Sequence, residues 1–129
     1  MLRNTRGARF SRILVVDDDI LTRELMMEAF DHRKYQVETL PSGLQLTEAL
    51  EGNSPDLIIL DVSLPWKNGF DLCHSIKSDV RWKNIPVLFM TARRANSDRA
   101  QGREAGADGY LTKPFTLKEL TEKVSELLH

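Results

Sequence analysis

Four short apolar runs in this chain each lead into a polar or charged side chain. Runs of this length, several of them rich in β-branched residues, predict buried strands. The four junctions are Ile13–Val16 into Asp17-Asp18-Asp19, Leu57–Leu60 into Asp61, Val87–Met90 into Thr91, and Tyr110–Thr112 into Lys113. If the runs are neighbouring parallel strands, their ends meet at one edge of one sheet. That edge would hold carboxylates, a hydroxyl group and an ammonium group.

The charge of the chain is balanced overall but uneven along its length. The 129 residues fit one domain, and the formal net charge is −1. Such a charge creates no general attraction to nucleic acid or to membranes, so we expect direct binding to neither. Four arginines and no acidic residue lie in the first twelve positions. We therefore expect residues 1–11 to be a disordered basic tail and residues 12–128 to be the folded domain.

Cysteine content and hydrophobic run length bear on the compartment of the protein. Cys73 is the single cysteine, so the chain cannot form an internal disulfide bond. This usage fits a reducing compartment. No apolar run approaches the length needed to span a bilayer. The sequence therefore predicts a cytoplasmic protein.

Strand-like and helix-like segments alternate along the chain. The predicted strands cover about 12–17, 35–40, 56–61, 86–91 and 110–112, and the predicted helices about 20–33, 43–52, 69–78, 95–105 and 117–127. Short helices between apolar strands call for a parallel sheet with helices on both faces. We expect an α/β, flavodoxin-like (βα)5 fold: a five-stranded parallel sheet in the order 2-1-3-4-5. In the first helix, Leu21, Leu25 and Ala29 share one apolar face, with Met26 and Phe30 beside it.

The acidic residues point to a cation site. Open parallel sheets bind ligands beyond the carboxyl ends of their strands where the strand order reverses, here next to Asp17, Asp18 and Asp61. Two carboxylates about 5 Å apart repel by roughly 3 kcal/mol at an effective dielectric near 20. Either one acid is protonated or a cation lies among them. Oxygen ligands without histidine or cysteine favour Mg²⁺, with Mn²⁺ as the alternative ion.

With a cation bound, this edge can accept a phosphoryl group. One carboxylate can attack phosphorus, Lys113 can neutralise phosphoryl oxygens, and Thr91 can donate a hydrogen bond to one. Each residue alone is more often structural, because aspartate commonly caps helices and Lys-Pro is common in loops. The interpretation depends on four strands delivering compatible groups to one edge, a coincidence that favours function.

These residues resemble the receiver domain of two-component response regulators. The resemblance covers about residues 11–128, nearly the whole chain. The stretches that carry it are Ile13–Asp19, Asp61, Leu64-Pro65, Asn68-Gly69, Ile85-Pro86-Val87, Thr91-Ala92, Gly106-Ala107-Asp108 and Tyr110–Phe115. The resemblance implies Mg²⁺-dependent self-phosphorylation and self-dephosphorylation as the only chemistry, so we do not expect an enzyme in the usual sense.

The resemblance also implies a role for each site residue. Asp61 would accept a phosphoryl group from a phosphohistidine on a sensor histidine kinase or a phosphotransfer protein. Asp18 would bind the metal directly, Asp17 largely through water, and the backbone carbonyl of Ser63 would complete the protein ligands. Lys113 would pair with the phosphoryl group, and its peptide bond to the following proline would be cis.

A pair of residues would convert phosphorylation into a change of surface. The resemblance implies that the Thr91 hydroxyl moves toward the phosphoryl group while the Tyr110 ring turns inward. This movement would bias a two-state surface formed by the fourth helix, the fifth strand and the fifth helix. The reader of that surface would be an unknown downstream protein or an attached output domain.

Four functions remain in competition at this point. The chain could be a stand-alone phospho-receiver or a receiver module of a longer regulator or hybrid kinase. A Mg²⁺-dependent phosphatase of the haloacid dehalogenase type ranks low, because that family needs an aspartate where Ser63 stands. A degenerate receiver that is never phosphorylated also ranks low, because the acidic residues, Thr91 and Lys113 are all present.

Overall fold

The structure, a computed structural model, describes residues 10–64, 68–92 and 96–128. The basic tail expected over residues 1–11 lies almost wholly outside these ranges. None of the helices within them combines the length and apolar character needed to cross a bilayer. In chain order the elements are β1 (Ser11–Val16), α1 (Ile20–Ala29), β2 (Tyr35–Leu40), the 3-10 turn η2 (Gly43–Gln45), α2 (Leu46–Gly52), β3 (Leu57–Asp61), α3 (Gly69–Lys77), β4 (Val87–Thr91), α4 (Asn96–Glu104), β5 (Gly109–Thr112) and α5 (Leu117–Leu128).

The strands form one parallel sheet in the order β2-β1-β3-β4-β5, which confirms the predicted fold. Its register decides which strand ends lie level with each other. Val16 of β1 pairs with Leu60 of β3, so the acids that follow these residues leave the sheet side by side. Asp61 itself pairs with Met90, which places Thr91 one residue further along β4. Parallel strands thus bring the predicted site residues to a common edge.

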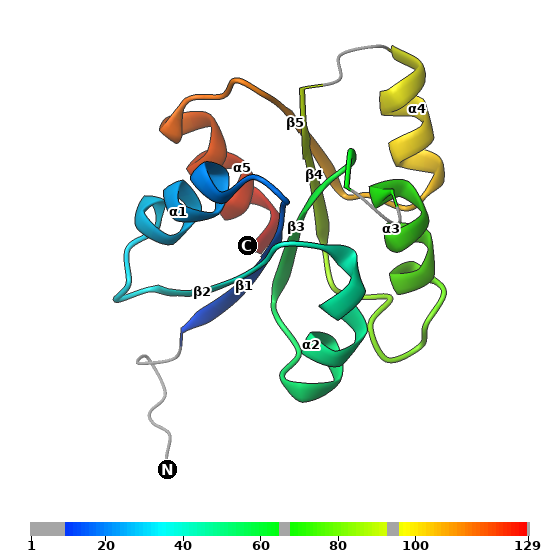
Figure 1. Cartoon of the computed structure of the whole chain (residues 1–129), viewed down its shortest axis with the longest axis horizontal. Helices are drawn as coiled ribbons and strands as arrows, with labels where there is room; N and C mark the ends of the chain where they lie inside the picture. Colours follow the sequence, from blue (N-terminus) through cyan, green and yellow to red (C-terminus); the bar gives the residue numbers. More distant parts are fainter. Residues whose placement is uncertain (1–9, 65–67, 93–95, 129) are drawn as a thin grey trace.

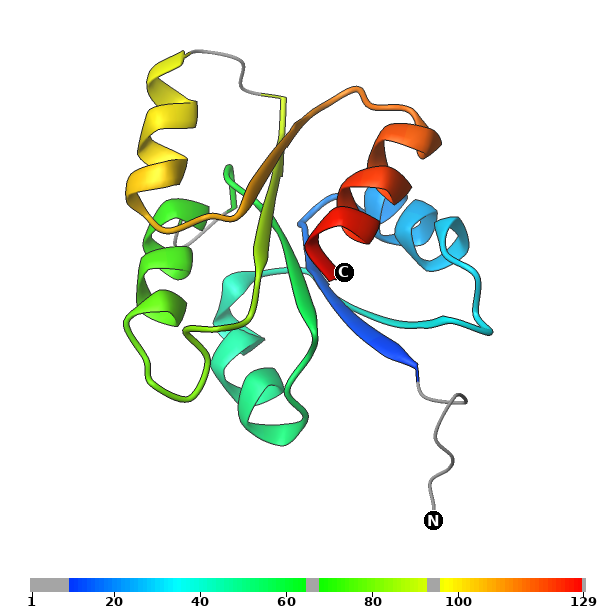
Figure 2. The ribbon, with the colours of Figure 1, turned by 180° about the vertical axis from the view of Figure 1, so that it is seen from behind.

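Helices cover both faces of the sheet. α1 and α5 lie on one face, and α2, α3 and α4 lie on the other (Figures 1 and 2). Side chains alternate between the two faces along each strand. In β1, Ile13 and Val15 join the core beneath α1 and α5, whereas Leu14 and Val16 join the core beneath α2 and α3. The central strands are therefore buried on both sides, which explains their unbroken apolar runs.

The first helix differs from its prediction in length and in orientation. It ends at Ala29 rather than near residue 33, because Phe30 already has extended backbone angles (φ −107°, ψ 144°). Met26 and Phe30 are buried, whereas Leu21 is 71% exposed and Leu25 is 52% exposed. The apolar face expected from the spacing of Leu21 and Leu25 was therefore wrong. The side of the helix that carries Met26 faces the sheet instead.

The start of α3 is packed directly against the end of β3. The Gly69 N–H donates to the Val62 carbonyl at 2.9 Å. A Cβ atom at Gly69 would lie 2.5 Å from the carbonyl oxygen of Asp61 and 2.8 Å from the Cα of Val62. Both obstacles are backbone atoms and cannot rotate away. Glycine at this position therefore allows the helix to close onto the strand that ends in Asp61.

We predict that Gly69→Ala lowers the free energy of unfolding by about 1–3 kcal/mol, because the added methyl group forces backbone apart. Gly52→Ala is the matched control, since no heavy atom lies within 4 Å of the position of its added Cβ. Alanine is favoured over glycine in helices, so the control should be unchanged or more stable by up to about 1 kcal/mol. Urea unfolding of both variants measures the difference. Equal stabilities would contradict the close approach.

Candidate functional site

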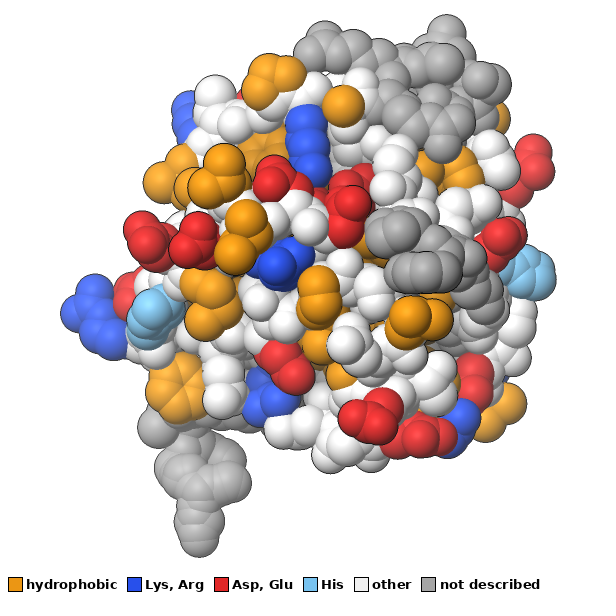
Figure 3. All heavy atoms as spheres, viewed as in Figure 1, with side chains coloured by type: hydrophobic (Ala, Val, Ile, Leu, Met, Phe, Trp, Pro, Cys, Tyr) orange, Lys and Arg blue, Asp and Glu red, His pale blue; other side chains and the backbone are white. Residues whose placement is uncertain are grey.

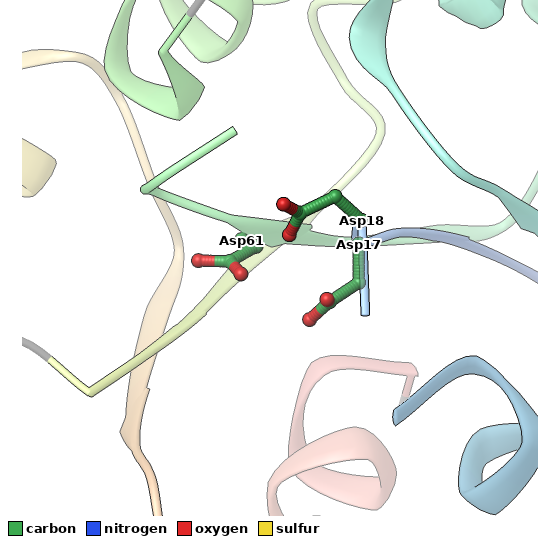
Figure 4. A group of neighbouring side chains, drawn as sticks. All are labelled: Asp17, Asp18 and Asp61. Atoms are coloured by element: carbon green, nitrogen blue, oxygen red, sulfur yellow. The ribbon is translucent and has the colours of Figure 1, made fainter. Parts of the chain in front are cut away.

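Three carboxylates converge at the carboxyl edge of the sheet. Asp17 and Asp18 follow the last residue of β1, and Asp61 is the last residue of β3. Each offers a carboxylate oxygen, and these oxygens all lie within 4.8 Å of one another. Figure 4 shows the three side chains clustered beyond the ends of the two strands. Asp17 and Asp61 are buried, whereas Asp18 is exposed to solvent.

The ammonium group of Lys113 bridges two of these acids. Its Nζ donates to Asp17 Oδ2 at 2.9 Å and lies 3.5 Å from Asp61 Oδ2. The lysine follows β5, and its backbone N–H donates to the Thr91 carbonyl at 2.7 Å. The Lys113–Pro114 peptide bond is cis, as the resemblance implied. The structure thus brings the predicted lysine to the predicted acids from a strand 96 residues away from Asp17.

Backbone amides orient the two buried carboxylates. The Asp19 N–H donates to Asp17 Oδ1 at 2.8 Å, and the Ser63 N–H donates to Asp61 Oδ1 at 3.0 Å. In both cases the donor lies two residues after the acid, which is the pattern of an Asx turn. The sequence analysis missed these two contacts. The signal was present, because an aspartate at the end of a strand often bonds its own backbone in this way.

Burial and charge shift the titration of Asp61 and Lys113. Burial raises the pKa of Asp61 above its usual value, and the nearby carboxylates of Asp17 and Asp18 act in the same direction. The Ser63 N–H and the Lys113 ammonium only partly offset this effect. Burial acts to lower the pKa of Lys113, but its contacts with Asp17 and Asp61 outweigh burial and raise that pKa. Burial thus disfavours the charged form of Asp61, and the two neighbouring acids add to this effect.

Thr91 and Tyr110 lie on β4 and β5, the two strands that follow β3 in the sheet. Thr91, the last residue of β4, is buried, and Tyr110 of β5 is partly exposed. The Tyr110 ring packs edge-to-face against Phe89, with ring centroids 6.3 Å apart. α4 lies close over both rings, since a Cβ at Gly102 would be 3.1 Å from the Phe89 ring and 3.6 Å from the Tyr110 ring. A movement of the Tyr110 ring would therefore alter its packing against α4.

The donor set fits a hard divalent cation. Among the described residues, the candidate metal cluster is made of aspartates alone, without histidine or cysteine. Such oxygen donors suit Mg²⁺ and related ions. The space-filling view shows acidic side chains gathered beside a basic one at this edge of the molecule (Figure 3). Because Asp18 is exposed, an ion can reach the cluster from solvent.

Comparisons with known proteins agree with this geometry. The family model described as response regulator receiver domain matches residues 13–125. Response regulator MprA of Mycobacterium sp. (strain KMS) is 39% identical over 117 residues, which cover 91% of this chain and 50% of that protein. The chain thus spans about half the length of the curated relatives that it matches.

Solved structures extend the agreement to three dimensions. A putative response regulator from Chloroflexus aurantiacus matches with a TM-score of 0.87 at 34% identity, covering 93% of this chain and 98% of that one. The phosphorylated cyanobacterial phytochrome response regulator RcpA matches with a TM-score of 0.79 at 28% identity, covering 92% of this chain and 91% of that one. The chain therefore belongs to the response regulator receiver domain family and is a phospho-acceptor of two-component signalling.

Proposed function

We propose that Asp61 is the residue that accepts the phosphoryl group, from a phosphohistidine of a sensor histidine kinase or a phosphotransfer protein. In this step the phosphorus–nitrogen bond of the donor breaks and a bond forms between phosphorus and a carboxylate oxygen of Asp61. The observation that carries the proposal is that the Asp61 carboxylate lies within 4.8 Å of the acidic pair and 3.5 Å from Lys113 Nζ. The Ser63 N–H holds one Asp61 oxygen, which leaves the carboxylate in a defined orientation.

Mg²⁺ is the cation that this site is proposed to bind, with Mn²⁺ as the alternative. Asp18 and Asp61 would bind it directly, together with the backbone carbonyl of Ser63. Asp17 would act through water, since it is fully buried and is the closer of the two acids bonded by Lys113. When bound, the ion supplies positive charge that lets an acidic site accept a phosphoryl group. The exposure of Asp18 supports its role as a direct ligand.

Lys113 and Thr91 would stabilise the phosphorylated product. The Lys113 ammonium lies 3.5 Å from Asp61 Oδ2. Once Asp61 is phosphorylated, this ammonium can pair with the phosphoryl oxygens. The Thr91 hydroxyl can donate to a phosphoryl oxygen from the end of the neighbouring strand β4. Neither residue needs to transfer a proton, because an ionised carboxylate attacks without losing one. Their contribution would be to position and neutralise the phosphoryl group.

Movement of Thr91 and Tyr110 would transmit phosphorylation to the surface. Movement of the Thr91 hydroxyl toward the phosphoryl group would leave space, and the Tyr110 ring would turn inward to fill it. The close packing of α4 over Phe89 and Tyr110 supports this coupling. The surface formed by α4, β5 and α5 would then have two states, of which phosphorylation favours one.

The same proposal implies a partner for the switched surface and a location in the cell. A downstream protein or an attached output domain would bind the switched surface, whether the receiver acts alone or as a module of a longer regulator or hybrid kinase. We propose a cytoplasmic location. Membership of the response regulator receiver domain family supports it.

Phosphorylation of Asp61 can be tested with acetyl phosphate and intact mass measurement. We expect one added phosphoryl group, dependent on Mg²⁺ and lost when EDTA is present. Asp61→Asn should remove the added mass, because the amide is not a nucleophile toward phosphorus. Asp71→Asn is the control, since Asp71 is an exposed acid of α3 outside the cluster. An unchanged mass for the folded wild-type protein would indicate a degenerate receiver instead.

The burial of Asp61 beside two other acids predicts a gain in stability when this residue loses its charge. Because the pKa of Asp61 is raised in the folded protein, ionised Asp61 costs stability as the pH rises through that value. Without divalent ions, Asp61→Asn should therefore be more stable than wild type at pH 7, by roughly 1 kcal/mol. The gain should vanish at a pH below the usual value of 3.8.

Thermal unfolding over this pH range measures the effect. Glu122→Gln of α5 is the control for loss of an exposed charge. Addition of MgCl2 should stabilise the wild-type protein more than Asp61→Asn, since the variant lacks one of the proposed ligands. Destabilisation of metal-free Asp61→Asn at pH 7 would show that the Lys113 contact outweighs the repulsion among the acids.

A further inference from the structure

One arginine outside the predicted site is bonded to the backbone of the acidic pair. Arg23 lies in the first turns of α1, and its Nη1 donates to the carbonyl oxygen of Asp17 at 2.8 Å. The side chain thus reaches back from the helix to the end of β1. The backbone N–H of Arg23 also donates to the Asp19 carbonyl at 3.1 Å. This hydrogen bond belongs to the first turn of α1, so the backbone of Arg23 is fixed close to the acidic pair.

The bonded carbonyl belongs to the peptide unit that links the two acids. The last backbone hydrogen bond between β1 and β2 is donated by the Asp17 N–H to the Leu40 carbonyl at 3.1 Å, so the Asp17 carbonyl lies just beyond the paired part of the strand. A peptide unit is planar and contains the Cα atoms of both residues that it joins. Fixing the direction of this carbonyl therefore fixes the plane from which the side chains of Asp17 and Asp18 both project. A free peptide unit at this point could rotate and separate them.

We propose that Arg23 is a positioning residue for the cation site, acting by holding the Asp17–Asp18 peptide unit. The inference depends on the proposed role of these acids in binding Mg²⁺. The guanidinium group suits this task, because its planar donors keep their charge and direction at all accessible pH values. A partner that orients metal ligands typically changes metal affinity by 10–100-fold when it is removed.

The charge of Arg23 provides a way to separate positioning from simple electrostatics. The charge at this edge is −2 when all its groups are ionised. It is the sum of four carboxylates (Asp17, Asp18, Asp19 and Asp61) and two cations (Lys113 and Arg23). Removal of the arginine charge makes the site more negative, which by itself strengthens the attraction for Mg²⁺. Loss of positioning acts in the opposite direction. The sign of the change in affinity therefore discriminates between the two roles.

The test is a titration of MgCl2 into the metal-free chain, followed by amide NMR shifts, for wild type, Arg23→Gln and Arg23→Lys. We expect the Kd for Mg²⁺ to rise roughly tenfold in Arg23→Gln, despite its more negative site. Arg23→Lys keeps the charge but lacks the planar fork, so its Kd should also rise. Arg33→Gln is the control, because Arg33 lies beyond the other end of α1 and its side chain is 91% exposed.

The outcomes separate this inference from the proposed function. Weaker binding by both Arg23 variants, with the Kd of Arg33→Gln unchanged, supports positioning. An unchanged or lower Kd in Arg23→Gln overturns it, and a loss of thermal stability without a change in Kd assigns Arg23 a purely structural role. If wild type itself shows no Mg²⁺-dependent shifts at Asp18 and Asp61, the proposed cation site fails and this inference fails with it. Arg23→Lys keeps the test valid if Arg23→Gln does not fold.

Discussion

The packing of two buried carboxylates against one ammonium group is the interaction on which this site depends. Asp17 and Asp61 lie at the ends of adjacent strands, and Lys113 contacts both. Burial weakens screening by water, so repulsion between the acids and their attraction to the lysine are both stronger than at the surface. Three carboxylates outnumber the one lysine, and burial together with the neighbouring acids raises the pKa of Asp61. The free chain is therefore poised to take up positive charge, which a divalent cation would supply.

Backbone contacts give this charged cluster its defined geometry. Asx-turn amides hold one oxygen of Asp17 and one of Asp61. Gly69 brings α3 so close to β3 that a single methyl group would collide with the Asp61 carbonyl. These contacts use main-chain atoms, which have little freedom once the sheet and helices have formed. A site built in this way can hold like charges near each other without allowing them to swing apart.

The fold could be predicted largely because its central strands are buried on both faces. Unbroken apolar runs such as Leu57–Leu60 have few other interpretations, and alternation with helices requires parallel connections. α1 was harder, because apolar residues surround most of it. Leu21 and Leu25 have the right spacing for a buried face yet are exposed, while Met26 is fully buried. Local periodicity could not show which side of such a helix meets the sheet, since that depends on how the connection from β1 turns.

Sequence alone determined which chemical groups meet at the site. Parallel strands end at one edge of the sheet, and the end of each apolar run shows which residue lies at that edge. The sequence placed Asp17, Asp18, Asp61, Thr91 and Lys113 together from four separate segments of chain. Only the tertiary structure decided how these groups are bonded. Lys113 lies closer to Asp17 than to Asp61, and Arg23 reaches back to the Asp17 carbonyl. Such contacts depend on differences of about an ångström in register, twist and helix placement, which residue spacing does not encode.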